Sequence, residues 1–420
     1  MTNGDPAATA ADWIAERGTE LTAYACELIR IPTDNPPGDC AAAADAAAAR
    51  LSALGLDVER YETPTGDGPP SPTVLGWLGP RTMTPELVLN AHLDASPPTP
   101  EWTEDPYAAT RRDGLIYGRG ATLSKSDVAA YTYAAAAAAE ALGTPSGTAV
   151  VAITADEGSG GDHGPRALLE RFGLRPARAI TAGFTHQVGI AHNGALQARL
   201  LVRGRAAHQA VVAPEEEAMR HAIAVAAGLV AAGDRLAQVQ GSVPGIAHPT
   251  LNVTRLAGGE WLGLAPGTVE LLVDRRVMPD EDFEAAGHEL ERLIAKLANE
   301  AGADVEVEMV QRAQPLRPTP QSERWAEIVQ AEAEQVLGEP VPLRGIPLYT
   351  DARWFGSHEV PTVLFGAGAD DIAGSGVNGQ DEHVAESDLL AAAQVVARVV
   401  TRALAGTAGE HEPIAVRSAG

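Results

Sequence analysis

A change in apolar periodicity near Gly194 restricts the fold of this 420-residue chain more than any other feature. Before Gly194, short apolar runs bounded by turn residues alternate with helical stretches such as 127–142. The apolar runs cover residues 73–78, 87–91, 148–154 and 179–182. Alternating strands and helices are typical of an α/β layer with parallel strands. We therefore predict an α/β fold with a central mixed, largely parallel sheet.

A different order of elements follows Gly194. Strand-like alternation and helical periodicity give the order βαββαβ, in residues 195–203, 215–232, 250–256, 269–277, 282–300 and 304–310. This order is the split arrangement of a ferredoxin-like domain. After Pro315 the chain returns to helices and to an apolar strand at 361–365, which indicates that the ferredoxin-like unit is an insertion.

Together these patterns predict a discontinuous catalytic domain in residues 1–194 and 312–405, with an inserted domain in 195–311. The length also favours two domains, because a chain of 420 residues is longer than a domain with a single hydrophobic core usually is. Residues 406–420 lose apolar periodicity and are predicted to form a flexible tail.

The charge of the chain excludes some classes of partner. The chain has 31 Lys and Arg against 56 Asp and Glu, for a formal net charge of −25. Such a charge repels phosphate backbones and anionic membrane surfaces, so we expect no nucleic-acid or membrane partner. The N-terminal residues are acidic rather than basic and apolar, and no long apolar stretch follows. We therefore expect a cytoplasmic protein.

The first candidate site residues stand at the end of a predicted buried strand. His92 follows the run 87–91, and Asp94 comes two residues later. Strand alternation puts both side chains on one face, at the carboxyl end of the strand, where α/β sheets bind ligands. A carboxylate there can hold one imidazole nitrogen and leave the other for a metal or a proton. Taken alone, the pair also fits an ordinary polar strand end.

A series of motifs after His92 resembles one family in the same order along nearly the whole chain. The motifs are Trp102, Asp105-Pro106-Tyr107, residues 113–121 with Lys125, Asp156-Glu157, 204–208, 274–279, 349–353 and 365–368. The chain is similar to the zinc-dependent family of acetylornithine deacetylase, succinyl-diaminopimelate desuccinylase, aminoacylase and glutamate carboxypeptidase. In that family an inserted ferredoxin-like domain serves as lid and dimerisation domain, so the resemblance implies a lid/dimerisation role for 195–311 and a homodimer.

The resemblance also implies positions for a two-zinc centre, and most of them carry other residues here. The family uses five ligands, and only the first is retained, as His92. The other four positions fall on Leu123, Gly158, Gly183 and Asn378. Zinc needs N, O or S donors, which leucine and glycine side chains do not have. We therefore expect a divergent member with no cofactor, unless zinc is held by relocated donors from among Asp127, Asp162, His163, His186, Asp381 and His383.

The family's other functional positions are better preserved. Glu157 matches the general acid/base that handles the proton of the attacking water. A surface glutamate in a glycine loop is the weaker alternative, because the preceding run 150–155 brings Glu157 to a sheet end. His208 matches the lid histidine that donates to the developing oxyanion in the partner's site. Asp94 would orient His92, whether that imidazole binds metal or acts as acid and base.

Two arginines are candidates for binding substrate. Arg276 matches the lid arginine that grips a substrate carboxylate, a task that suits a bidentate guanidinium. Arg353 matches the arginine of a late family segment, and an ion pair with Asp351 is its alternative role. Gly263 stands where the family has an asparagine that contacts substrate.

Three functions remain open from the sequence. The first is an enzyme acting on an amide or related acyl C–N bond of a small amino-acid-like molecule, with Glu157 as general acid/base and little or no metal. Because a general base alone supplies a limited rate enhancement, this hypothesis includes acyl transfer, cyclisation and condensation as well as hydrolysis. The second is a zinc amidohydrolase with relocated ligands, and the third is a catalytically dead binding protein. A serine-lysine hydrolase based on Ser124 and Lys125 is weaker, because adjacent residues of a helix do not face each other.

Overall fold

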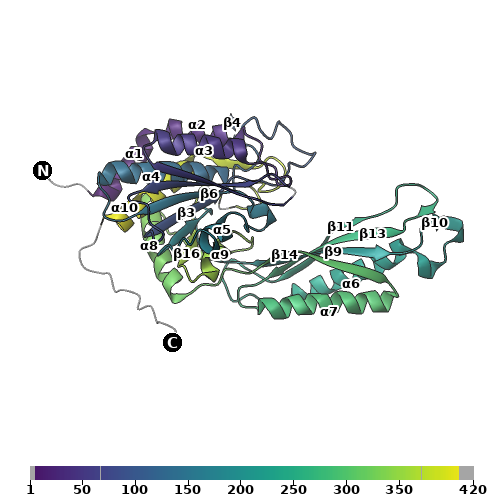
Figure 1. The fold of residues 1–420 in the computed structure, drawn as a ribbon. Helices are drawn as coiled ribbons and strands as arrows, with labels where there is room; N and C mark the ends of the chain where they lie inside the picture. Colours follow the sequence, from purple (N-terminus) through teal and green to yellow (C-terminus); the bar gives the residue numbers. More distant parts are fainter. Residues whose placement is uncertain (1–4, 67, 370, 406–420) are drawn as a thin grey trace.

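The computed structural model describes residues 5–66, 68–369 and 371–405, and these form two units (Figure 1). The predicted tail, 406–420, lies outside the described residues. The larger unit contains the first and last helices of the described chain. The smaller one extends away from it and contains the strands and helices from β9 (Gly194–Arg203) to β14 (Asp304–Ala313).

An eight-stranded mixed sheet forms the centre of the larger unit. Across the sheet, the strands are β1 (Asp57–Thr63), β2 (Ser71–Leu78), β6 (Ala149–Thr154), β3 (Leu87–His92), β7 (Ala179–Thr181), β16 (Thr362–Leu364), β8 (Val188–His192) and β15 (Leu343–Ile346). β6, β3, β7 and β16 run parallel to one another, as do β8 and β15. The predicted mixed, largely parallel sheet is confirmed. The sequence did not predict β1, β8 or β15, because these short or polar strands at the two ends of the sheet lack a strong apolar pattern.

Helices pack against both faces of this sheet (Figure 1). They are α1 (Pro6–Glu16), α2 (Gly18–Ile29), α3 (Ala41–Ala53), α4 (Lys125–Leu142), α5 (Pro165–Glu170), α8 (Pro320–Leu337), α9 (Ala352–Ser357) and α10 (Glu386–Leu404). α4 is the central helix of one layer and contacts α1, α2 and α10. Its alanine run, 134–138, is buried, and such small side chains let the neighbouring helices approach closely. A separate small sheet has the order β17 (His383–Ala385), β5 (Leu115–Tyr117), β4 (Thr110–Arg112).

The smaller unit is an antiparallel sheet with two helices. Its strand order is β11 (Thr250–Ala257), β13 (Thr268–Val277), β9, β14, and its helices are α6 (Ala218–Leu236) and α7 (Phe283–Ala301). Both helices bury one apolar face against the sheet in a core that is separate from that of the larger unit. α7 begins with Asp282, whose side chain caps Ala285 N, and ends before Gly302, which adopts φ +62°. The predicted ferredoxin-like order βαββαβ is confirmed, with one added pair of short strands, β10 (Ala207–His208) and β12 (Leu264–Ala265).

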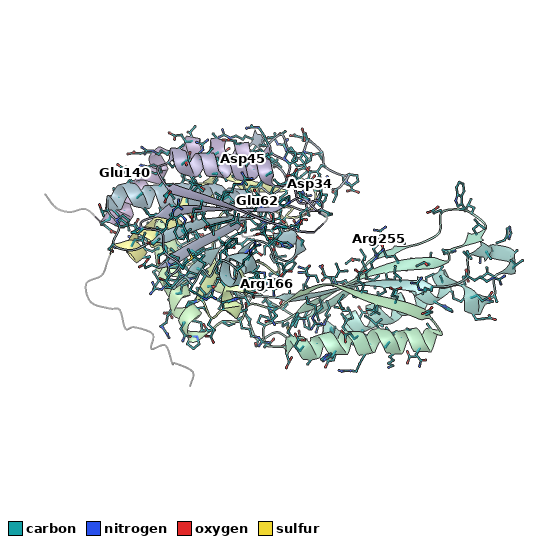
Figure 2. The ribbon with its side chains drawn as sticks, in the orientation of Figure 1. Asp34, Asp45, Glu62, Glu140, Arg166 and Arg255 are labelled. Atoms are coloured by element: carbon teal, nitrogen blue, oxygen red, sulfur yellow. The ribbon has the colours of Figure 1, made fainter. Side chains whose placement is uncertain are left out.

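Charged side chains cover the outside of both units. Figure 2 shows examples on the larger unit, such as Asp45 and Glu62, and on the smaller unit, such as Arg255. All three are exposed. None of the helices that the structure describes is long and apolar enough to cross a bilayer.

Candidate active site

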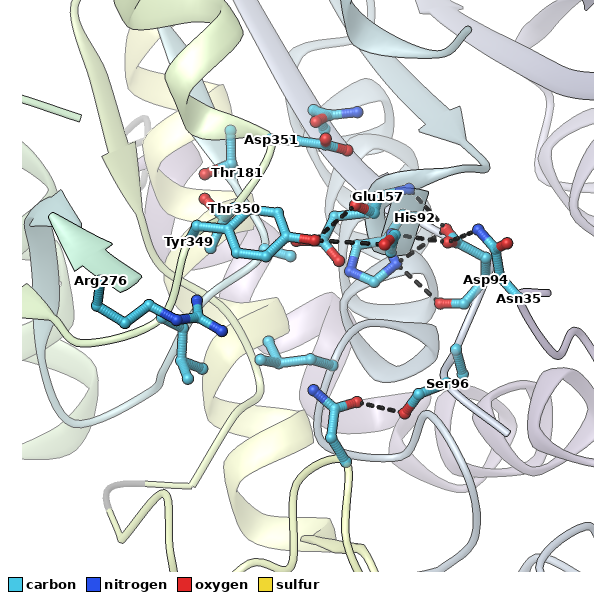
Figure 3. A pocket seen from close by; sticks show the side chains of 17 residues that line it. Asn35, His92, Asp94, Ser96, Glu157, Thr181, Arg276, Tyr349, Thr350 and Asp351 are labelled. Atoms are coloured by element: carbon cyan, nitrogen blue, oxygen red, sulfur yellow. Dashed lines mark hydrogen bonds and ion pairs between the residues drawn. The ribbon is translucent and has the colours of Figure 1, made fainter. Parts of the chain in front are cut away.

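A cavity of about 220 Å³ opens at the carboxyl ends of the central parallel strands. Its polar lining includes Asn35, Asn90, His92, Asp94, Ser96, Glu157, Thr181, Arg276, Tyr349, Thr350, Asp351 and Asn378. Most of these residues come from the ends of β3 and β7, from the turn after β6, from β13 of the smaller unit and from the segment before α9, and Asn35 and Asn378 come from turns elsewhere in the larger unit. The fold therefore brings His92, Asp94, Glu157 and Arg276 together, although they are far apart in the sequence (Figure 3).

His92, which is partly buried, and Asp94, which is buried, form a pair at one wall of the cavity. His92 Nδ1 lies 2.9 Å from the backbone carbonyl of Asp94 and 3.3 Å from its Oδ1, so this nitrogen carries the hydrogen. Burial alone would lower the pKa of His92, but the hydrogen bond to Asp94 and the charge of Glu157 raise it to about 10. Burial alone would raise the pKa of Asp94, but the bond to His92 and the imidazolium charge lower it to about 2. The ring nitrogen left for a ligand is Nε2.

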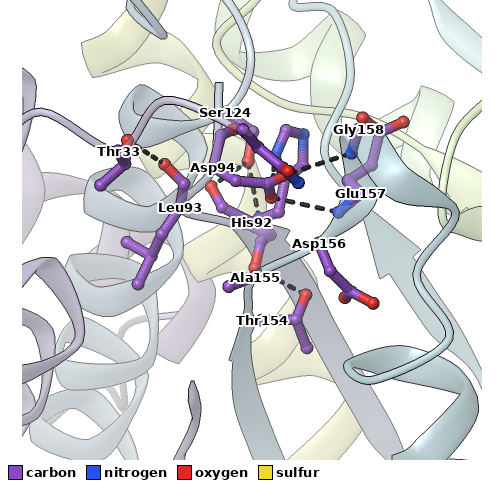
Figure 4. A network of polar contacts seen from close by, with 12 residues as sticks. Thr33, His92, Leu93, Asp94, Ser124, Thr154, Ala155, Asp156, Glu157 and Gly158 are labelled. Carbon is purple, nitrogen blue, oxygen red and sulfur yellow. Dashed lines mark hydrogen bonds and ion pairs between the residues drawn. The ribbon is translucent and has the colours of Figure 1, made fainter. Parts of the chain in front are cut away.

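Asp94 also connects this pair to the turn that carries Glu157. Its carboxylate accepts the backbone N–H groups of Glu157 at 3.1 Å and Gly158 at 3.0 Å (Figure 4). It also accepts a hydrogen bond from the side-chain amide of Asn35 at 2.9 Å (Figure 3). Asn35 donates as well to Ser159 Oγ at 3.1 Å. A single buried carboxylate thus orients the imidazole and fixes the backbone of the next strand end, which supports the predicted orienting role of Asp94.

Glu157 lies three residues after the last residue of β6 and in the cavity wall, near the strand end where the sequence predicted it. Asp156, the residue before it, has φ +95°, so the chain turns sharply at the strand end and presents Glu157. Burial raises the pKa of Glu157, the positive charge of His92 opposes this shift, and the charge of Asp94 adds to it. The position and environment are those expected of a group that exchanges protons with a bound ligand.

Side chains from α9 and from the segment before it donate hydrogen bonds to the backbone carbonyls of the same turn. Tyr349 Oη donates to the carbonyls of Glu157 at 3.3 Å and Gly158 at 3.4 Å, and Trp354 Nε1 donates to the carbonyl of Gly160 at 2.9 Å. Arg353 also donates to Gly160 O. It is buried, stacks on Trp354 and does not line the cavity. This placement favours a role for Arg353 in holding the Glu157 turn over the predicted contact with substrate.

Arg276 reaches the cavity from β13 of the smaller unit. Its Nε donates to Asp274 at 2.7 Å, and its guanidinium lies over the ring of Tyr349, 5.4 Å from the ring centre. In Figure 3, Arg276 and Glu157 lie on opposite sides of the Tyr349 ring. The two Nη groups make no hydrogen bond to any residue that the structure describes, so they remain available for a bidentate anion.

His208 does not reach the cavity of its own chain. It lies on β10, at the end of the smaller unit farthest from the central sheet (Figure 1), and it is exposed. Apolar side chains around it are also exposed: Val211, Trp261, Leu262 and Leu264. Within one chain, His208 therefore cannot act with Glu157.

The family's metal positions do not fit a two-metal centre in this chain. Leu123 presents an apolar side chain to the cavity, and Gly158 presents none. A Cβ built on Gly183 would lie 2.5 Å from Phe365 N, so no ligand side chain has room there. The amide oxygen of Asn378 accepts a hydrogen bond from Ser96 Oγ at 2.9 Å. In residues 5–66, 68–369 and 371–405, no group of three or more His, Cys, Asp or Glu side chains could hold a metal.

Five of the six candidate replacement donors contact other residues, although Oδ2 of the buried Asp127 has no hydrogen-bond partner among the described residues. His186 contacts Glu339 and Asp388, and Asp162 pairs with Arg166. Asp381 accepts from Thr103, and His383 packs on Tyr117. Asp127 is buried and accepts Ala367 N. None of these six donors, His163 included, lines the cavity with His92.

The serine-lysine alternative has no support in the geometry. Ser124 Oγ exchanges hydrogen bonds with the backbone of His92, and Lys125 Nζ donates to the carbonyl of Ile31 at 2.8 Å. Both side chains are fully buried and outside the cavity lining.

The sequence pattern of peptidase family M20/M25/M40 matches residues 88–402, about three quarters of the chain. The chain belongs to this family. Its M20 relatives include a succinyl-diaminopimelate desuccinylase of Gluconacetobacter diazotrophicus, 29% identical over 398 residues, which are 91% of this chain and 97% of the relative. Aminoacylase-1 of Mus musculus is 28% identical over 360 residues, 81% of this chain and 85% of the relative.

Solved structures agree with the M20 fold. Human carnosine dipeptidase 1 superposes with a TM-score of 0.77 at 18% sequence identity, covering 95% of this chain and 99% of that one. A di-peptidase from Saccharomyces cerevisiae gives the same TM-score at 14% identity, covering 97% and 100%. The resemblance inferred from the motifs is confirmed.

The cavity residues to which the sequence assigned no role at the site include Tyr349, Asp351 and Asn35. Tyr349 and Asp351 stand within a family motif, and their position next to Arg353 was the only available signal. Asn35 lies in a proline-rich break, which shows nothing of its contact with Asp94.

Proposed function

We propose that this M20 protein is an enzyme acting on an amide or related acyl C–N bond of a small amino-acid-like molecule, with Glu157 as general acid/base and with little or no metal. One observation carries the proposal: Glu157, His92 and Arg276 line one cavity, in which three of the family's four other ligand positions are Leu123, Gly158 and Asn378. The relatives named for desuccinylase and aminoacylase activity support the amide class.

Each group has a part that follows from its contacts. The two free Nη groups of Arg276 bind a substrate carboxylate and so set the distance of the acyl group from Glu157. Glu157 takes the proton of the attacking water or amine and returns it to the leaving nitrogen. His92, with Nδ1 fixed by Asp94, offers Nε2 to the acyl oxygen.

The absence of suitable ligands favours chemistry with a lower barrier. A general base typically increases the reaction rate by about 10²- to 10⁴-fold. Hydrolysis of an unactivated amide needs a larger rate enhancement than this. Acyl transfer, cyclisation or condensation of an activated molecule on the same groups needs a smaller enhancement. The relocated-zinc alternative receives less support, because its candidate donors lie outside the cavity.

Metal content and turnover, measured on the same protein, test this proposal. We expect well under one equivalent of zinc per chain after mild dialysis, because the side chains at four of the five family positions offer no suitable ligand. The protein would then be incubated with N-acyl amino acids, dipeptides and activated acyl donors, with and without a chelator, and products followed by mass spectrometry. We expect conversion of at least one compound to persist with chelator. Two tightly held metals, with activity lost on chelation, would contradict the proposal.

We further propose a homodimer in which His208 serves the partner's cavity. The exposed apolar residues around His208, Trp261 and Leu262 among them, support a contact that one chain does not provide. The test mixes two inactive variants, His208→Ala and Glu157→Gln, under conditions that allow subunit exchange. A mixed dimer would contain one cavity with both groups, so we expect roughly a quarter of wild-type activity to return. A monomer in sedimentation, or His208→Ala at full activity, would remove His208 from the mechanism.

A further inference from the structure

Asp351 is a buried carboxylate at the cavity wall that lacks a partner. The residue is 5% exposed, immediately precedes α9, and lines the cavity together with Glu157. Its Oδ2 is buried and has no hydrogen-bond partner in the part of the chain that the structure describes. Arg353, which could have paired with it, donates to the Gly160 carbonyl instead.

An unpaired charge in this place is unfavourable. A buried carboxylate without a partner loses its hydration, and the neighbouring carboxylate of Glu157 adds repulsion. Both effects raise the pKa of Asp351, to about 8, and burial contributes more than the charge of Glu157. His92 is the cation whose charge acts most strongly on both acids, and it is already hydrogen-bonded to Asp94. A ligand cation placed beside Asp351 would relieve this repulsion.

We propose that Asp351 is the acceptor for a protonated amine of the substrate. This inference rests on the proposed function and narrows its substrate class. Arg276, on the other side of the Tyr349 ring, presents free guanidinium nitrogens to the same cavity (Figure 3). A molecule with a carboxylate at Arg276 and an ammonium group at Asp351 satisfies both. The substrate class is therefore a small zwitterionic amide, with a free amine, rather than a simple N-acyl amino acid.

Glycyl-L-alanine and N-acetyl-L-alanine form a matched pair of probes, since they differ only by the ammonium group. Binding of each would be measured by calorimetry on the Glu157→Gln variant, which prevents turnover. We expect glycyl-L-alanine to bind about 10- to 100-fold more tightly, the effect of one charge-assisted hydrogen bond. The added substitution Asp351→Asn, which keeps the shape and removes the charge, should abolish this preference and leave the affinity for N-acetyl-L-alanine nearly unchanged.

Asp156→Asn is the matched control. Asp156 is a second buried carboxyl group near Asp351, with pKa raised to about 9 mainly by burial, but it does not line the cavity. Its substitution should leave the preference intact. Equal affinity for the two probes, or a preference that survives Asp351→Asn, would overturn the inference. The proposed function would survive this result if wild-type protein still converts an amide and the conversion depends on Glu157. Failure of wild-type protein to bind either probe would count against both proposals.

Discussion

The substitution Glu157→Gln is expected to lower kcat by about 10²- to 10⁴-fold, the contribution usual for a general acid/base. Glutamine has nearly the same shape as glutamate, so the turn after β6 should keep its hydrogen bonds to Asp94 and Tyr349, which involve only the backbone of residue 157. The amide group, however, cannot accept the proton of the attacking nucleophile. The measurement is the steady-state rate with the compound that the screen identifies, together with its binding affinity, which should change little.

Two further variants make this test specific. Glu62→Gln, an exposed glutamate on β1 that pairs with Arg60, should leave the rate unchanged. His92→Asn should reduce the rate to a degree comparable with Glu157→Gln if the imidazole acts on the acyl oxygen, without changing metal content. A Glu157→Gln protein that kept most of its wild-type rate would show that Glu157 is not the base.

Asp94→Ala is expected to have the largest effect on stability, a loss of about 3–5 kcal/mol in the free energy of unfolding. The substitution leaves four donors in or near the cavity without their acceptor: the imidazole of His92, the amide of Asn35, and the backbone N–H groups of Glu157 and Gly158. Because these groups are wholly or partly buried, water replaces the lost bonds only in part. Activity should be lost as well, since both His92 and the Glu157 turn lose their support. Urea unfolding measures the first effect and steady-state kinetics the second.

The controls separate the pairing from the volume of the side chain. Asp94→Asn keeps the shape and one acceptor oxygen, so we expect an intermediate loss of stability. Asp45→Ala removes an exposed carboxylate that pairs with Arg60 on the surface (Figure 2), and its effect should be small. A loss below about 1 kcal/mol for Asp94→Ala would contradict the role assigned to this residue as the acceptor that joins two strand ends.

Much of the candidate site follows from local sequence. His92 and Asp94 were predicted at the end of an apolar strand, and Glu157 after another, because a strand pattern locates its own end. The sequence also specified which side chains stand at the family's ligand positions. These predictions needed only neighbouring residues and the order of motifs.

Other assignments depend on contacts that no local pattern contains. Arg353 and Tyr349 stand four residues apart in one motif, yet Arg353 points to the Gly160 carbonyl and Tyr349 lines the cavity under Arg276. Asn35 reaches Asp94 across 59 positions of sequence. The direction of each side chain was decided by the hydrogen-bond acceptors that packing places beside it.

The sequence by itself thus determined the two kinds of domain, the ends of the central strands and the replacement of four of the five metal-ligand positions. These are properties of periodicity and residue identity, which act over a few neighbouring residues. The tertiary structure decided which polar groups are left without a hydrogen-bond partner. Arg353 donates from Nη2 to a backbone carbonyl and lies outside the cavity lining, whereas Asp351 and the Nη groups of Arg276 line the cavity and remain unpaired among the described residues. A polar group is available to a ligand only if no other group of the folded chain forms a hydrogen bond with it. Which groups are available therefore depends on the whole tertiary structure.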